Sequence, residues 1–495
     1  MSMHYETLEA RFSKINDLNH ALAMLQWDDA AVMPSGGGVA RAEAVATLNG
    51  LIHDQLSTPE VAELIQATAD EPLDAWQRAN VLEMKRSFDT AMAVPVDLVT
   101  AYSKATSICE QTWRRLRAAN DFKGVLSLLS EVVNLTRRRA QCLAEAKGLG
   151  HYDALLDTYE PGLRQTDVDP LFSSLSDFLP ECIDSILARQ QPVIPIDGPF
   201  TERRQANLGR LMMARLGFDF DHGRLDVSHH PFCGGVPDDT RITTRYNESN
   251  FLESLFGVLH ETGHALYEQG LPSTWRNQPV GSSGGMALHE SQSLFMEMQV
   301  CRSPAFIAFA APHIRDAFGG DNESEKWSVD NLLRHVRKVG RGFIRVDADE
   351  ATYPLHVILR YELEKALVAG DLDSADVPDA WDEKMRSHLG LSTTGNDADG
   401  CMQDVHWFSG AIGYFPTYTL GALAAAQLFQ SATESIDDLP DSIALGEFGA
   451  LVGWLRREVH SQGRLLATGP LIEKITGRPL GTEAFRVHLQ DRYLD

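Results

Sequence analysis

The segment Phe251–Glu268 reads FLESLFGVLHETGHALYE and contains the pentapeptide His260-Glu261-Thr262-Gly263-His264. Apolar residues lie on both sides of the pentapeptide, so the segment is predicted to form a helix that is apolar nearly all round and therefore buried. Positions i and i+4 of a helix share a face, so both histidines can reach one ion, and Glu261 can reach a water on that ion. This spacing predicts the layout of a zinc peptidase site.

The same five residues also fit a plainer interpretation. Two histidines and a glutamate at this spacing arise by chance in long, Glu-rich helical proteins, where they form an exposed helix with solvated imidazoles. The flanks argue against it, because Phe256 and Leu259 precede the pentapeptide and Leu266 follows it. Polar groups in a buried helix are costly unless something satisfies them, and a divalent metal with a water would do so.

A catalytic zinc site needs a third protein ligand. The best candidate is Glu290, which lies 26 residues after His264 in the sequence His289-Glu290-Ser291-Gln292. The glycine-rich turn 281–285 between them allows two helices to pack side by side. Two alternatives stay open: Glu290 only stabilises the start of its helix through the dipole, or Glu297 is the ligand.

Helical periodicity covers most of the rest of the chain. Near the N-terminus, Leu8, Phe12 and Ile15 recur at helical spacing before Pro34 and three glycines break the pattern. Further helices are predicted over residues 39–56, 59–69, 73–92, 96–119, 123–147, 168–189, 287–301, 304–317, 328–340, 350–368, 378–388, 404–429, 443–461 and 482–490. With no clear linker, residues 1–495 are predicted to form a single catalytic domain.

One stretch ahead of the pentapeptide has a different composition. Residues 240–246 are rich in β-branched residues, and Leu225–Ser228 is short and suited to extended structure. Gly234, Gly235 and Pro237 between them suit a turn. These features predict a small antiparallel β-sheet beside the metal helix, within a mainly α fold.

Composition excludes several classes of function. The chain of 495 residues has 44 Lys and Arg against 69 Asp and Glu, a net charge of −25, so nucleic-acid binding by phosphate neutralisation is not expected. Six cysteines are scattered without a C-x-x-C pair, which indicates buried free thiols in a reducing compartment. Neither a signal peptide nor a run of ~18 apolar residues is evident, so no membrane association and a cytoplasmic location are expected.

Six ordered motifs carry a resemblance that covers essentially the whole chain. They are His230-Pro231-Phe232, Asp239-Thr240-Arg241-Ile242-Thr243, His260–His264, His289-Glu290-Ser291-Gln292, Ile344-Arg345-Val346-Asp347-Ala348-Asp349 and Gly400-Cys401-Met402-Gln403-Asp404-Val405-His406-Trp407. In these motifs the chain resembles the thermostable metallocarboxypeptidase family typified by carboxypeptidase Taq.

The resemblance implies a metal-dependent carboxypeptidase that removes single C-terminal residues with broad specificity. It implies a helical body similar to neurolysin and angiotensin-converting enzyme, with two halves flanking a deep groove, and a homodimer. It also implies that His260, His264 and Glu290 bind the metal, that Glu261 is the general base, and that the metal is Zn²⁺, with Co²⁺ as a possible substitute.

Three further residues are predicted to lie around the metal. Tyr418 is the first candidate to stabilise the oxyanion that forms on the scissile carbonyl, and His406 is the second. Tyr414, in the same short segment, is a candidate for substrate contact. For each of the three, ordinary aromatic packing with a satisfied polar tip is the alternative.

An exopeptidase must also bind a free carboxylate, and the arginine fork suits this task. Arg345 is the best candidate, with Gln403 as a possible hydrogen-bond partner of the same substrate end. Arg241 and Arg360 stay open, since either would serve equally well in a structural ion pair. The strand containing Arg241 offers an edge for pairing with a peptide backbone, and His230 is more consistent with a structural role.

Two alternative functions remain at this point. An endo-oligopeptidase or dipeptidase of the same metal class shares every feature of the pentapeptide. A non-catalytic helical scaffold that keeps the site is less consistent with the sequence, because Glu261 and both histidines are intact.

Overall fold

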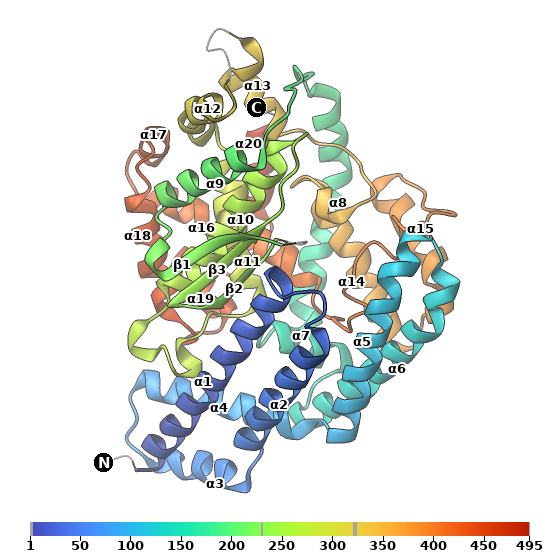
Figure 1. Cartoon of the computed structure of the whole chain (residues 1–495), viewed down its shortest axis with the longest axis vertical. Helices are drawn as coiled ribbons and strands as arrows, with labels where there is room; N and C mark the ends of the chain where they lie inside the picture. The colour runs from blue at the N-terminus through green and yellow to red at the C-terminus, as the bar shows by residue number, and fades with distance from the viewer. Residues whose placement is uncertain (1–2, 229–230, 320–323, 495) are drawn as a thin grey trace.

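The structure, a computed structural model, describes residues 3–228, 231–319 and 324–494. The mainly α fold is confirmed: the described residues form 20 α-helices and three short strands. In Figure 1 the N-terminal helices make up the lower end of an elongated molecule, and the other helices stand above them. His230, which belongs to one of the motifs, lies outside the described residues.

The N-terminal helices pack around a small core of their own. They are α1 (Met3–Ala31), α2 (Gly38–Leu56), α3 (Pro59–Ala67) and α4 (Ala75–Ala93). Leu8, Phe12 and Ile15 of α1, the residues whose spacing predicted this helix, meet Val61 and Met84 there. This group therefore has an apolar core of its own, while α1 and α4 also contact the rest of the protein.

Most of the remaining helices surround one of two large apolar cores. The first is lined by α5 (Val96–Ala118), α6 (Phe122–Lys147), α7 (His151–Tyr159), α8 (Gln165–Arg189), α14 (Tyr353–Ala369), α15 (Val377–Leu389) and α20 (Glu483–Tyr493). The second is lined by α9 (Glu202–Leu216), α10 (Phe251–Gly270), α11 (Met286–Leu294), α12 (Pro304–Phe318), α13 (Val329–Val336), α17 (Leu439–Leu445), α18 (Gly449–Glu458) and α19 (Thr468–Thr476).

Helix α16 (Pro416–Ser435) belongs to both large cores. Leu420 and Leu423 pack into the first core, whereas Ala425 and Leu428 pack into the second. A helix that is apolar all round is buried on every side, and more than half of the residues of α16 are buried. It therefore joins the core around the pentapeptide helix α10 to the other large core.

The predicted sheet is present, but it is mixed. Its strands are β1 (Gly223–Val227), β2 (Cys233–Val236) and β3 (Asp239–Thr244), in the order β1-β3-β2. β2 and β3 form the antiparallel hairpin, whereas β1 pairs with β3 in parallel, so the prediction of a purely antiparallel sheet is wrong. The glycines assigned to a turn lie in β2 itself. β3 lies between β1 and β2, so the prediction that the strand of Arg241 offers an edge for a peptide backbone is wrong.

Two predicted helices differ most from the structure. The helix predicted over 404–429 starts only at Pro416, because the preceding residues form turns in which Gly410 and Gly413 have φ of 81° and 93°. The helix predicted over 443–461 is split into α17 and α18 at Gly446, whose φ is 75°. Helices α7, α9 and α19 were not predicted.

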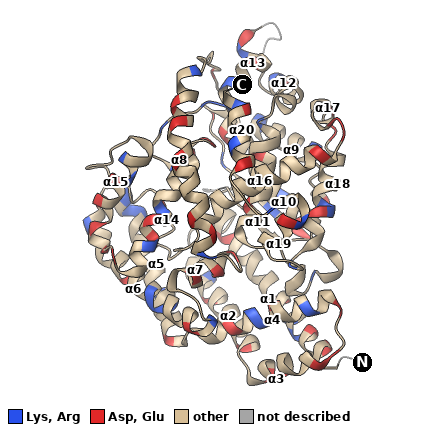
Figure 2. Ribbon diagram, turned by 180° about the vertical axis from the view of Figure 1, so that it is seen from behind, with Lys and Arg blue, Asp and Glu red and all other residues tan. Residues whose placement is uncertain are grey.

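The surface and the thiols agree with the composition. All six cysteines lie among the described residues and are free. In the described part of the chain, no helix is both long and apolar enough to span a membrane. Figure 2 shows basic and acidic residues interspersed along the helices seen in that view, with acidic residues in the majority over the sequence.

Candidate active site

Helix α10 brings three polar groups of the pentapeptide to one place. It starts at an N-cap, Asn250, whose side chain accepts a hydrogen bond from the Leu252 N–H at 3.2 Å. Its apolar residues, among them Leu259 and Leu266, pack into the second core. The face that remains carries the two histidines and Glu261.

The carboxylate of Glu160 fixes the start of helix α11. Glu160, which follows α7, accepts a hydrogen bond from the Ala287 N–H at 2.7 Å, so it satisfies one of the free donors at the start of α11. It also accepts a hydrogen bond from Thr468. Burial raises the pKa of Glu160. These contacts set the position of Glu290, one turn further along α11.

The three predicted metal ligands converge. Glu290 Oε2 lies 3.4 Å from His264 Nε2 and 3.9 Å from His260 Nε2, and the three ligand atoms lie within 4.8 Å of one another. Among the described residues, this is the one group of three or more His, Cys, Asp or Glu side chains whose ligand atoms lie close enough together to hold a metal ion. Two imidazoles and one carboxylate are a donor set that zinc accepts in catalytic sites. The residues present therefore fit a divalent metal.

The charge state of Glu290 suits this role. Burial by itself would raise the pKa of Glu290, but the hydrogen bond with His264 and the charge of His260 lower it to about 2. The carboxylate is therefore ionised at neutral pH. Gly421 of α16 lets this side chain come close, because a Cβ on that glycine would lie 2.8 Å from Glu290 Cβ.

Glu261 faces the same space without a partner. Its side chain is buried, and its Oε2 atom has no hydrogen-bond partner among the described residues. Burial raises the pKa of Glu261 to about 7, against the attraction of His260. A buried carboxylate oxygen that lacks a partner beside the three ligand atoms is suited to bind a water molecule and to exchange a proton with it.

The Nδ1 atoms of the two histidines have different partners. His260 Nδ1 lies 2.9 Å from Glu297 Oε2, and the other oxygen of Glu297 accepts a hydrogen bond from Arg302 at 2.7 Å. Glu297 lies in the π-helix Phe295–Cys301 that continues α11, and it is not a member of the ligand group. His264 Nδ1 contacts a histidine instead, His289, at 2.7 Å.

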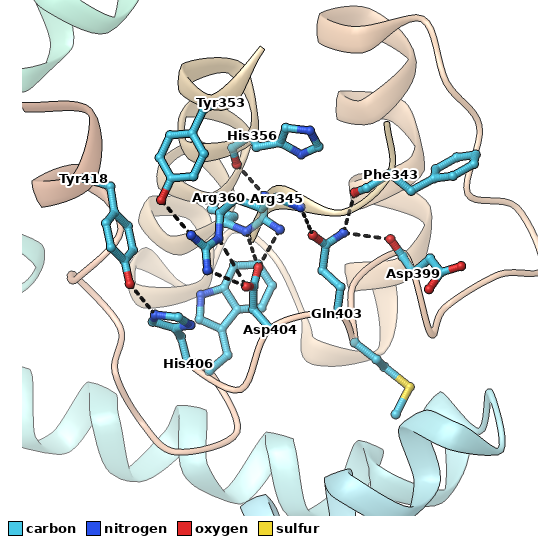
Figure 3. A network of polar contacts seen from close by, with 12 residues as sticks. Phe343, Arg345, Tyr353, His356, Arg360, Asp399, Gln403, Asp404, His406 and Tyr418 are labelled. Carbon is cyan, nitrogen blue, oxygen red and sulfur yellow. Dashed lines mark hydrogen bonds and ion pairs between the residues drawn. The ribbon is translucent and has the colours of Figure 1, made fainter. Parts of the chain in front are cut away.

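A second cluster of polar residues is built around Asp404 (Figure 3). Arg345 Nη2 donates to Asp404 Oδ1 at 2.8 Å, and Arg360 Nε donates to Oδ2 at 2.7 Å. Burial would raise the pKa of Asp404, but the two arginines lower it far below its usual range. Arg360 is fully buried in this ion pair. Two guanidinium groups share one carboxylate, so the cluster keeps a net positive charge.

Gln403 holds the backbone around Arg345. Its Oε1 accepts a hydrogen bond from the Arg345 N–H at 2.8 Å, and its Nε2 donates to the Phe343 and Asp399 carbonyls at 2.8 and 2.7 Å. The amide is thus engaged on both sides by the protein's own backbone (Figure 3).

Tyr414, Tyr418 and His406 form an aromatic group beside the Asp404 cluster. His406 Nε2 lies 3.1 Å from the Tyr418 hydroxyl, and the ring of Tyr418 lies 4.9 Å from the guanidinium carbon of Arg345. Burial and the negative charge of Glu290 raise the pKa of Tyr414 to about 12. Burial lowers the pKa of His406 to about 3, so this imidazole is neutral.

Arg241 belongs to strand β3 of the sheet. Its guanidinium is bound by Asp239, with contacts at 2.9 and 2.6 Å, and its carbon lies 4.5 Å from the ring centre of Trp27 at the end of α1. The arginine is therefore held between a carboxylate and an aromatic face, and α1 reaches the sheet beside the pentapeptide helix.

Several residues of the site were not singled out from the sequence. Asp404, Arg302 and Glu268 had no role assigned, and His289 was quoted only as part of a motif. The available signals are that Asp404 directly follows Gln403 and that His289 directly precedes Glu290, each within a motif. The others become visible only when α10, α11 and the π-helix pack together.

Comparisons with known proteins agree with this geometry. The sequence profile of the family described as "Carboxypeptidase Taq (M32) metallopeptidase" matches residues 7–493. "Thermostable carboxypeptidase 1" of Thermus thermophilus is 38% identical over 485 residues, which cover 95% of this chain and 94% of that protein. "Carboxypeptidase 1" of Bacillus subtilis is 31% identical, and the alignment covers 99% of both chains.

Solved structures share the whole fold. "Trypanosoma Cruzi Metallocarboxypeptidase 1" superimposes with a TM-score of 0.97 at 40% identity, with 100% of both chains covered. The M32 carboxypeptidase from Deinococcus radiodurans R1 gives a TM-score of 0.94 at 33% identity, covering 99% of both chains.

Proposed function

The chain belongs to the carboxypeptidase Taq (M32) metallopeptidase family and is a metallocarboxypeptidase, and from this premise we propose that it removes single C-terminal residues from peptides with broad specificity, with Glu261 as the general base. The observation that carries the proposal is the unpartnered carboxylate oxygen of Glu261 beside the ligand atoms of His260, His264 and Glu290.

His260, His264 and Glu290 would hold the metal, with Zn²⁺ as the ion that best suits two imidazoles and a carboxylate and Co²⁺ as a possible substitute. When bound, the ion supplies Lewis acidity and lowers the pKa of a bound water. Glu261 takes the proton of the attacking water and passes it to the leaving amine.

Tyr418 is proposed to stabilise the oxyanion. Its hydroxyl lies 3.1 Å from His406 Nε2, and the imidazole is neutral. If His406 donates its Nε2–H to the tyrosine oxygen, the Tyr418 proton is left free to point at the developing charge. Tyr414 is proposed to contact the substrate, since the negative charges of Glu290 and Glu261 both raise the pKa of its hydroxyl.

The free carboxylate of the substrate is proposed to bind near Arg345. The surplus positive charge of the Arg345–Asp404–Arg360 cluster attracts an anion, and Gln403 holds the Arg345 backbone in place. Arg241 is proposed as a further contact from the sheet side. The groove between two helical halves and the homodimer remain predictions from the family resemblance.

The experiment is product identification on matched peptides. The purified protein is incubated with an N-blocked dipeptide and with its C-terminally amidated form, with and without chelator. Release of the free C-terminal amino acid from the acid form only, abolished by chelator and restored by zinc or cobalt, supports the proposal. Internal fragments, or equal cleavage of the amide, would instead identify an endo-oligopeptidase.

A further inference from the structure

His289 stands between two residues of the pentapeptide helix. Its Nδ1 lies 2.7 Å from His264 Nδ1, and its Nε2 lies 2.8 Å from Glu268 Oε1. His264 and Glu268 are one turn apart on α10, whereas His289 comes from α11 and directly precedes the ligand Glu290. A single imidazole therefore bridges both helices that carry the metal ligands.

The positions of the protons follow from these contacts. Glu268 is ionised, because the hydrogen bond from His289 outweighs the effect of burial and lowers the pKa of this carboxyl. An ionised carboxylate only accepts hydrogen bonds, so His289 Nε2 carries a proton. With Nε2–H directed at Glu268, the Nδ1 lone pair of His289 faces His264 at 2.7 Å and can accept a hydrogen bond from His264 Nδ1–H. This arrangement leaves the lone pair of His264 on Nε2, the atom that faces Glu290.

The second ligand histidine is held by a shorter chain. His260 Nδ1 contacts the carboxylate of Glu297 directly at 2.9 Å, and Arg302 pairs with that carboxylate. Partners of this kind set the tautomer and ring orientation of metal-binding histidines. One ligand histidine thus contacts a carboxylate directly, and the other reaches one through an imidazole.

We propose that His289 is a positioning residue for His264: it accepts a hydrogen bond from His264 Nδ1 and donates one to Glu268, and so holds His264 in the tautomer and orientation that a divalent metal requires. This inference rests on the proposed metal site. It assigns a role to a histidine that neither binds the metal itself nor acts on the substrate.

The test measures metal affinity rather than turnover. His289→Phe keeps the ring but removes both nitrogen contacts, and His289→Gln keeps an acceptor and a donor on one side chain. The zinc dissociation constant of each purified variant is measured by competition with a chromophoric chelator, and the absorption spectrum of the cobalt form reports the ligand geometry. Thermal unfolding of the metal-free proteins reports the fold separately.

The expected result is a loss of about 10–100-fold in zinc affinity for His289→Phe, the range for such partners, with most of the affinity restored in His289→Gln. His335→Phe is the matched control: this histidine on α13 makes one ring contact, to the Ile194 carbonyl at 2.9 Å, and lies outside the ligand group, so its zinc affinity should stay that of the wild type.

Two results would overturn the inference: unchanged zinc affinity in His289→Phe, or an equal loss in the Phe and Gln variants. A lower melting temperature of the metal-free His289→Phe protein at unchanged affinity would indicate a purely structural tie between α10 and α11, and so also overturn it. Failure of the wild-type protein to bind zinc would refute the proposed function itself, before any variant is compared.

Discussion

Gly263 of α10 packs directly against Ser293 of α11, so closely that a Cβ on the glycine would stand 2.6 Å from Ser293 Cα. Real Cβ atoms do not approach a backbone atom this closely, so only glycine allows the two helices to lie at this distance. The spacing matters because one helix carries His260 and His264 and the other carries Glu290.

Gly263→Ala is therefore expected to destabilise the protein, by about 1–3 kcal/mol from overpacking, and to weaken metal binding. Chemical denaturation and zinc titration measure the two effects. Gly257→Ala, on the same helix, is the matched control, because nothing lies within 4 Å of a Cβ at that position. It should be neutral or stabilising by about 0.5–1 kcal/mol. Equal behaviour of the two variants would refute the role assigned to Gly263.

Glu261→Gln is expected to lower kcat by about 100–10,000-fold, the usual contribution of a positioned general base. The variant should still bind one equivalent of zinc, because Glu261 is not among the three ligand atoms. Steady-state kinetics and elemental analysis check both statements. A variant that keeps normal turnover would exclude Glu261 as the base, and one that loses its metal would identify it as a ligand.

Arg345→Ala is expected to reduce kcat/KM on peptides with a free C-terminal carboxylate by about 10–100-fold, as for loss of a charge-assisted hydrogen bond. Its effect should fall mainly on KM. Arg341→Ala is the control: this arginine lies four residues earlier and pairs with Asp184 at the surface. If both variants behaved like the wild type, the carboxylate would have to bind elsewhere, and Arg241 would be the next position to test.

Asp157→Asn is expected to destabilise the protein at neutral pH and to lose this effect in acid. Asp157 is 5% exposed and contacts Lys147 and Arg164 at 2.9 and 3.0 Å. Burial raises its pKa, but the hydrogen bonds from Lys147 and the Gly162 N–H outweigh burial and lower the pKa from 3.8 to about 2. The folded state thus favours the charged form, which stabilises by about 2 kcal/mol at pH 7.

Because the folded pKa is the lower one, this stabilisation is complete above the unfolded value of 3.8 and is lost as the pH falls through about 2. Urea denaturation of the wild type and of Asp157→Asn should therefore differ most at pH 7 and converge only as the pH falls to about 2. Asp89→Asn removes an exposed pair with Lys85 and should cost under about 1 kcal/mol at any pH. A difference for Asp157→Asn that does not vary with pH would contradict the prediction.

Local patterns predicted the helices well where periodicity and capping act within one segment. α10 is the clearest case, since its apolar flanks and the i, i+4 histidines appear in the structure as predicted. The predictions failed where a few residues override a pattern. Gly410 and Gly413 replace the start of a predicted helix with turns, and β1 pairs with β3 in parallel although the strand compositions predicted an antiparallel sheet.

The sequence by itself determined the arrangement of His260, Glu261 and His264, because they lie on one turn of a helix whose periodicity is a local property, but it left Glu290 and Glu297 open as the third ligand. Only the tertiary structure decided what surrounds these residues. Asp404 meets Arg345 and Arg360 from 59 and 44 residues away, and His289 meets His264 from 25 residues away. Such contacts depend on how separate helices pack and how closely a glycine lets them approach, which no pattern within a single helix records.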